Sequence, residues 1–425
     1  MPPRLPGELT DRIIWLVSDY RTMLSCALVC QEWLPGSRTA LLDCVRLNRK
    51  PGYDSFIKYV LSSEHMYPYL RTTRAMWIDD RLASGSLVLT EQPWSYRTIH
   101  EFSGHFPKLE HLRLSHIDWN SPKHWQPHPS VHLAIRGFTS LRKLELMWCQ
   151  LPSWHTLRRL VMALSPSLTF LTLLNVSCPI PRGDAPALVY HATASLHEFE
   201  LIGAPSISGS NRGLEPFLRW LSYSCPSNSL RRLVFMEPNL STEYGVILTR
   251  IVPGLVELYI ITSPASLRIF PFHELRSLRV LEVGMRGVAL GPYWKDLSHL
   301  LPDIPSRIRS IALYVMIKRP PDMAREDESL SDCPPFEDDG LELLDPVLQG
   351  DNFHSLERVE VRLHPSHESY DLADMQARVI GLVQRKLPSV VSRGIQVAVS
   401  LDLSGSFESY AVPFLLDKAA KSVTS

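Results

Sequence analysis

Nine segments of the chain share one spacing of apolar residues, L-x-x-L-x-L, in which other apolar side chains replace leucine at some positions. The copies begin at Leu109, Leu141, Leu168, Leu196, Leu230, Leu255, Leu278, Ile308 and Leu356, and Leu42/Val45/Leu47 form a weaker copy before them. Successive side chains of a strand point to opposite faces. The pattern therefore predicts one short strand per copy, with its leucines turned toward a core and the intervening residues turned away.

Helical patterns lie between several copies, and a further strand pattern, Ile395–Leu401, follows the last one. The apolar faces of these helices are Leu157/Leu160/Leu164, Leu214/Phe217/Leu218/Leu221, Tyr244/Ile247/Leu248/Ile251 and Met375/Val379/Leu382/Val383. Strands that alternate with helices favour a parallel sheet with helices outside it. Successive copies begin 32, 27, 28, 34, 25, 23, 30 and 48 residues apart, whereas leucine-rich repeats usually span about 20–29 residues.

We therefore expect an α/β protein whose main part, residues 48–403, is an irregular leucine-rich-repeat solenoid with a parallel concave sheet and outer helices. An ordinary α/β sheet with buried strands is the alternative, and nine copies of one template argue against it. An acidic insertion is expected at about 320–346, because Asp322–Asp345 hold ten acidic residues against Arg325. Such a segment is typically solvated, and a regulatory or partner-binding role is the alternative. Residues 404–425 are expected to form a C-terminal tail.

The first 47 residues carry a different pattern, which predicts three short helices. Leu9, Ile13 and Leu16 form one helical stripe, Leu24 and Leu28 belong to a second helix, and a third begins at Pro35, a residue favoured at the first helical position. Three short helices bury little surface by themselves, so this part of the chain is expected to need a partner.

These 47 residues resemble the F-box. The matching positions are Leu5, Pro6, Glu8, Leu9, Ile13, Leu16, Leu24, Leu28, Val29, Cys30 and Trp33, and Ser37, Arg38, Leu41 and Leu42 continue the third helix as in the large fungal F-box family. Gln31 departs from the pattern, since a basic residue often follows the Val-Cys pair. The alternative is a three-helix cap that buries the same stripe against the repeats.

The resemblance implies that residues 1–47 bind the Skp-type adaptor, and through it the cullin, of a cullin–RING ubiquitin ligase, with Cys30 in the helical core. The implied adaptor-binding residues are Leu5, Pro6, Leu9, Ile13, Leu24, Val29 and Trp33.

Composition narrows the function classes. Lys+Arg and Asp+Glu both number 44, and this balance argues against nucleic-acid binding and against electrostatic membrane binding. Seven scattered cysteines indicate no disulfide framework and favour a reducing compartment, the cytoplasm or nucleus. We also expect no signal segment and no membrane span, because neither has a matching apolar run.

Candidate chemistry is sparse. Seven histidines lie between His100 and His132 with Trp119 and Trp125, but their spacing wanders and no cysteine is near, so a long exposed loop is expected rather than a zinc site. Cys26 and Cys30 stand one helical turn apart, which the F-box pattern explains without a metal. Hydrolase, nucleotide-binding and metalloprotease motifs are absent from the sequence. We therefore expect no enzyme activity, no cofactor and no metal.

The residues between the template leucines are expected to form the target-binding surface. Their apolar and aromatic members lie among glutamates, such as Glu198 and Glu257, which suits a basic protein partner. The predicted target-binding residues are Phe170, Glu200, Val234, Met236 and Tyr259. Three alternatives are that these side chains pack against one another across strands, that loops cover them, or that the convex helices bind the target.

The pattern as a whole predicts a substrate-recognition subunit of an SCF-type ubiquitin ligase, which holds an unknown protein target near an enzyme supplied by its partners. The alternative is a leucine-rich-repeat interaction scaffold that uses the F-box for non-degradative assembly. An enzyme with its active site on the repeat loops is the third class, and only spatial information could support it.

Overall fold

The computed structural model divides into two compact units, Met1–Leu196 and His197–Ser425. We describe each unit by itself. The residues that the structure describes are 5–17, 19–81, 94–119, 131–178, 195–203, 214–226, 229–236, 240–285, 290–317, 340–365 and 372–401.

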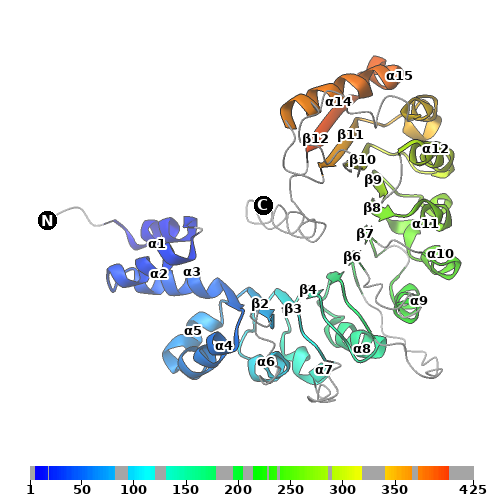
Figure 1. Ribbon diagram of the computed structural model, residues 1–425. Coiled ribbons are helices and arrows are strands. Elements are labelled where there is room, and N and C mark those ends of the chain that lie inside the picture. Colours follow the sequence, from blue (N-terminus) through cyan, green and yellow to red (C-terminus); the bar gives the residue numbers. More distant parts are fainter. Residues whose placement is uncertain are drawn as a thin grey trace, which may run out of the picture. The chain divides into compact units, whose positions relative to one another are not determined.

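The first unit begins with three helices and continues with parallel strands that pair in chain order (Figure 1). The helices are α1 (Gly7–Leu16), α2 (Tyr20–Val29) and α3 (Leu34–Asp43). The strands are β1 (Cys44–Leu47), β2 (Ala75–Asp79), β3 (His111–Ser115), β4 (Lys143–Met147) and β5 (Phe170–Leu174). The main connecting helices are α4 (Lys50–Phe56), α5 (Tyr67–Leu70), α6 (Ser95–Phe102), α7 (Val131–Ala134) and α8 (Trp154–Leu164).

The second unit repeats the same arrangement of strand and helix, with the helices on one side of the strands (Figure 1). Its strands are β6 (Glu198–Ile202), β7 (Arg232–Met236), β8 (Glu257–Thr262), β9 (Val280–Met285), β10 (Ser310–Ile317), β11 (Arg358–Pro365) and β12 (Gln396–Leu401). Its helices are α9 (Glu215–Ser224), α10 (Thr242–Leu248), α11 (Pro264–Ile269), α12 (Leu290–Leu300), α13 (Leu344–Val347), α14 (Leu372–Lys386) and α15 (Pro388–Ser392).

The template leucines lie in register within each unit. Leu144 of β4 stands opposite Leu112 of β3 and Leu171 of β5, and Leu258 of β8 stands opposite Leu233 and Leu281. All of these side chains are fully buried. The core therefore lies between the strands and the helices, as the repeat pattern predicts, and parallel pairing is confirmed in both units.

One strand was not predicted. Strand β2 follows Thr73, which occupies the first template position and is fully buried. Met76 and Ile78 fill the other two positions and stand opposite Leu112 and Leu114 of β3. The L-x-x-L-x-L template requires an apolar residue at all three positions. It does not detect this copy, because threonine replaces the first leucine.

A repeated turn follows the strands of the first unit. His116, Trp148 and Asn175 directly follow β3, β4 and β5, and all three have left-handed backbone conformations, with φ of 56°, 51° and 49°. Such a conformation is disfavoured for residues other than glycine. Beyond this turn the strands pair again through isolated bridges, Asp118 with Gln150 and Gln150 with Ser177. This repeated corner shows that three repeats of the first unit share one backbone conformation after the strand, despite their unequal lengths.

One sequence interpretation is corrected here, and two others fall largely outside the described residues. The histidine-rich segment is not one long loop, because His100 lies in α6, His111 in β3 and Trp119 is buried. His124 and His128 lie outside the described residues. Of the acidic insertion, residues 318–339 lie outside the described ranges, and Leu344–Val347 form α13. The predicted tail also lies outside them.

Candidate interaction surfaces

The helices α1, α2 and α3 form a small bundle with a thin interior. Asp19 caps α2 by accepting hydrogen bonds from the backbone N–H and the hydroxyl of Thr22, both at 2.7 Å, and these bonds lower the pKa of Asp19. Pro35 lies in the first turn of α3. Ile14 of α1 and Gly36 of α3 are buried where these two helices meet.

The bundle leaves most of its apolar side chains exposed to solvent. No side chain of α2 is buried, whereas α1 buries only Thr10 and Ile14. The exposed fractions are 59% for Leu5, 48% for Leu9, 46% for Ile13, 79% for Leu16, 42% for Leu24, 87% for Leu28 and 61% for Val29. Exposed apolar side chains are therefore concentrated on this small unit.

The predicted adaptor-binding residues all belong to this bundle. Leu5, Pro6, Leu9, Ile13, Leu24 and Val29 are exposed, and Trp33 is half-buried. Cys30, which the sequence pattern placed in the core, is exposed instead. Helix α2 ends at Val29, one residue before Cys30, and none of its own residues is fully buried. We call the exposed leucine, isoleucine and valine side chains of α1 and α2 the apolar stripe.

The strand face without helices carries a row of stacked side chains in the first unit. Arg46, Trp77 and Arg113 stand opposite one another on β1, β2 and β3. The two guanidinium groups lie 4.1 and 4.6 Å from the centre of the Trp77 ring. This geometry is that of cation–π contacts on both sides of one indole.

Glu145 of β4 ends this row and is fully buried. It pairs with Arg113, with Lys143 at 2.6 Å and with His111 at 3.1 Å. Burial opposes the charge of this carboxylate, but His111, Lys143 and Arg113 outweigh it and hold the pKa of Glu145 well below its usual range. Lys143 also lies 4.5 Å from the centre of the Phe170 ring.

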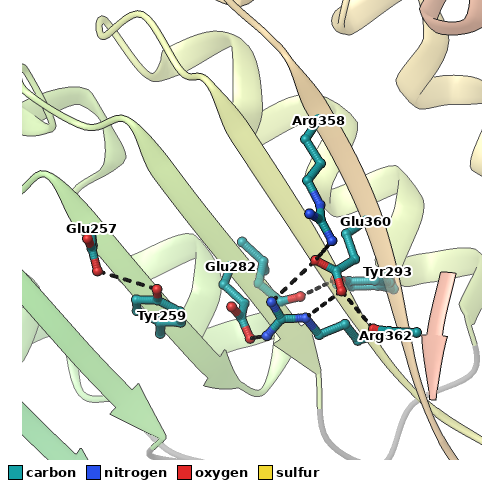
Figure 2. Close-up of polar contacts among 9 residues, drawn as sticks. Glu257, Tyr259, Glu282, Tyr293, Arg358, Glu360 and Arg362 are labelled. Carbon is teal, nitrogen blue, oxygen red and sulfur yellow. Dashed lines mark hydrogen bonds and ion pairs between the residues drawn. The ribbon is translucent and has the colours of Figure 1, made fainter. Parts of the chain in front are cut away.

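The same face of the second unit holds a cluster around Arg232 of β7. Its guanidinium group lies 3.1 Å from Glu198, 3.3 Å from Glu200 and 3.4 Å from Glu257. It also lies 4.7 Å from the centre of the Tyr259 ring. Figure 2 shows the Tyr259 hydroxyl directed toward Glu257, at 3.4 Å. Burial raises the pKa of Tyr259 to about 12.

A second cluster forms around Arg362 of β11 (Figure 2). Arg362 lies 2.8 Å from Glu282 and 3.1 Å from Glu360, and Arg358 also pairs with Glu360 at 3.1 Å. Ser400 donates a hydrogen bond to Glu360 at 2.7 Å. Glu282 and Glu360 both pair with Arg362, so the positive charge of this arginine is divided between them. Burial raises the pKa of Glu282 to about 7.

The predicted target-binding residues are covered more than the alternation of strand residues suggests. Exposed fractions are 8% for Phe170, 4% for Glu200, 2% for Val234 and 6% for Met236, while Tyr259 is half-buried. Packing against one another across strands, one of the alternatives drawn from the sequence, therefore describes their surroundings better than an open surface does. Adjacent strands bring long side chains into contact, so Lys143 lies over Phe170 and Arg232 over Tyr259. Phe170 belongs to the first unit and the other four to the second, and target binding by them stays a prediction.

Within the described ranges, no group of three His, Cys, Asp or Glu side chains is placed to hold a metal ion. None of the helices described there combines the length and apolar character that crossing a membrane requires.

The parallel strands in chain order, their common register and the repeated corner define a leucine-rich-repeat-like α/β fold. No protein-family model matches the chain, and no curated protein does. Among solved structures, the chain is similar to the crystal structure of a TLR13–ssRNA13 complex, with 15% identity over 79% of this chain and a TM-score of 0.30. The match spans 41% of that chain. A likeness of this size says nothing about what the present chain binds.

Proposed function

We propose that this protein is the substrate-recognition subunit of an SCF-type cullin–RING ubiquitin ligase. The observation that carries the proposal is the apolar stripe on α1 and α2, which coincides with the positions that resemble the adaptor-binding residues of an F-box. Residues 1–47 would bind the Skp-type adaptor, and the repeats would hold a protein target. The protein would supply positioning rather than chemistry, and it would act in the cytoplasm or nucleus.

The energetics of the apolar stripe support a bound partner. Complete burial of one leucine, isoleucine or valine side chain contributes about 1.5–3 kcal/mol. Leu9, Ile13, Leu24 and Val29 are each at least 42% exposed, so a partner that covers all four gains several kcal/mol from these residues alone. Within the bundle these four side chains stay exposed, and no side chain of α2 is fully buried.

The helix-free face of the second unit supports target binding through charge. Five glutamates of its described strands, Glu198, Glu200, Glu257, Glu282 and Glu360, accompany three arginines, Arg232, Arg358 and Arg362. The excess of carboxylates favours a basic segment of the target. Glu200, Val234, Met236 and Tyr259 of this unit remain the residues proposed to contact it, with Tyr259 the most accessible among them, and Phe170 of the first unit remains a separate proposed contact.

The adaptor contact is tested with the double variant Leu9→Asp/Ile13→Asp in the full chain. Two carboxylates on the apolar stripe would have to be buried unpaired in the complex, at a cost of several kcal/mol. We expect recovery of the Skp-type adaptor in a pull-down with purified proteins to fall at least about tenfold, which corresponds to about 1.4 kcal/mol.

The matched control is Leu133→Asp/Val246→Asp, which places two carboxylates at exposed apolar positions of α7 and α10. It should recover the adaptor like the unmodified chain. Unchanged recovery by the folded Leu9/Ile13 variant would refute the proposed docking. Adaptor binding without any effect on target turnover in cells would instead favour a non-degradative scaffold.

A further inference from the structure

A small cavity lies between neighbouring helices of the first unit, away from the strand face described above. Its volume is about 330 Å³, and its lining residues are His132, Arg136, Arg158, Arg159, Met162 and Ala163. Four of these six side chains are arginine or histidine. This concentration of basic groups is local, because the chain as a whole has equal numbers of Lys+Arg and Asp+Glu.

The amphipathic pattern of the helices explains why these side chains meet. In α8, Leu157, Leu160, Val161 and Leu164 face the core. Arg158, Arg159 and Met162 therefore lie on the side of α8 that faces away from the core. His132 lies in α7 and Arg136 follows in the adjoining 3-10 turn Ile135–Gly137. Both segments pack against α8, so the two sets of basic side chains converge on one cavity.

Electrostatics in this region agree with a concentrated positive potential. His155, one turn before Arg158 and Arg159 on α8, has a lowered pKa because it is partly buried and because these two arginines repel its protonated form. Arg136 and Arg159 have no ion-pair partner among the residues that the structure describes. Positive charges gathered around one cavity repel one another, and an anion in the cavity would relieve that repulsion.

We propose that this cavity binds a phosphoryl group. Arginine side chains present several N–H donors in a planar fork that matches phosphate oxygens. A phosphoryl group offers three acceptor oxygens and carries a charge of about −1.5 to −2 near neutral pH, which suits several converging cations better than a single carboxylate does. The cavity is at the small end of the range for ligand sites, so it fits one such group. Its basic residues come from α7, the adjoining 3-10 turn and α8 and gather at one place. A local cluster favours a phosphorylated protein side chain over a nucleic-acid backbone.

The site is tested by isothermal titration calorimetry of the full chain with inorganic phosphate, exchanged against chloride at constant ionic strength. We expect one saturable site. Arg136→Gln/Arg159→Gln should weaken the binding at least about tenfold, because both guanidinium forks are lost. Both arginines are exposed, so the unfolding temperature of the variant should equal that of the unmodified chain.

The matched control is Arg219→Gln/Arg250→Gln, which removes two exposed arginine charges from the helical side of the second unit. It should bind phosphate within twofold of the unmodified chain. The absence of a saturable phosphate site, or an equal loss in the two double variants, would overturn the proposal.

Two further titrations distinguish the source of the phosphoryl group. A pool of phosphoserine peptides that binds more tightly than both inorganic phosphate and the unphosphorylated pool would identify a protein partner. Binding of inorganic phosphate alone would identify a free phosphate ligand in the same cavity. The proposal goes beyond the function proposed above and does not depend on it, because the cavity lies in the repeats and adaptor binding is measured separately.

Discussion

Glu145 shows how one buried carboxylate can hold several cations in place. His111, Arg113 and Lys143 all point at it, and each of the three side chains retains some exposure. If its charge is removed, Arg113 and Lys143 lose their common counter-charge and His111 loses its acceptor, but all three side chains can still be solvated in part. The effect on stability should therefore lie at the lower end of the range for a broken buried ion pair, about 3 kcal/mol.

We predict that Glu145→Gln lowers the free energy of unfolding by about 3 kcal/mol at neutral pH, measured by urea denaturation. The pKa of Glu145 is lowered by folding, so the stabilisation is present above the unfolded pKa and is lost as the pH falls toward the folded one. Glu110→Gln, at an exposed position next to β3, is the control and should change stability by less than about 0.5 kcal/mol. Equal effects of the two substitutions would show that the cations do not depend on Glu145.

Glu282 presents the opposite case, because folding raises its pKa to about 7 from an ordinary value of 4.5. Burial is the largest cause, Arg362 opposes it, and Glu360 competes for the same arginine. Between these two pKa values the folded state binds more protons than the unfolded state. The free energy of unfolding should therefore fall as the pH rises through this window.

We predict that the unmodified chain loses on the order of 2 kcal/mol more stability than Glu282→Gln when the pH is raised from about 5 to about 8. Glutamine occupies nearly the same volume and does not titrate, so the difference between the two curves isolates this carboxyl group. The measurement is urea denaturation at a series of pH values. Curves that run parallel for the two proteins would mean that Glu282 is ionised throughout.

At the scale of helices and strands, the close approach of α10 and α11 depends on one glycine. A Cβ atom at Gly245 would lie 2.7 Å from the carbonyl oxygen of Ile269 and 2.9 Å from its Cγ2. Backbone cannot move aside as a flexible side chain can. The two helices would have to separate, although alanine is the better helix former by about 1 kcal/mol.

We therefore predict that Gly245→Ala lowers the free energy of unfolding by about 1–3 kcal/mol, the usual range for overpacking. Gly381→Ala in α14 is a matched control, because no atom lies within 4 Å of the added Cβ there. The control should leave stability unchanged or raise it by up to about 1 kcal/mol. Thermal denaturation of the two variants provides the comparison, and a stabilised Gly245 variant would show that the helices separate at little cost.

Periodicity was sufficient to predict most elements of the repeats. The template located strands such as β4 and β7, and the helical pattern located α8 and α10. Both signals depend on which residues face a core, and the core face is the same in every copy. Strand β2 was missed because Thr73 takes a leucine position, which shows that burial between neighbouring strands tolerates a small polar side chain.

The side chains on the helix-free face were harder to predict. Alternation correctly placed Leu144 and Glu145 on opposite faces of the sheet. It does not predict how much of the Glu145 side chain the neighbouring strands bury. For Glu145, coverage depends on the length and charge of Arg113, about 30 residues away in sequence, as well as on Lys143 of its own strand. The basic cavity was missed for a related reason, since Arg136 and Arg159 become neighbours only through helix packing.

For the whole molecule, charge balance conceals local asymmetry. The chain has no net charge, yet carboxylates outnumber arginines on the helix-free face of the second unit, and basic side chains surround the cavity of the first. Overall composition argued against nucleic-acid binding and electrostatic membrane binding, and that argument stays a prediction. It carries no information about single sites that need only a few converging charges.

The order of the strands also affects how the protein is made. In each unit, the described strands pair with the strand that precedes or follows them in the chain. The first partner of every new strand has therefore already left the ribosome when that strand emerges. Contacts between near neighbours in sequence close short loops and form quickly, so the repeats of each unit can be added one after another during synthesis.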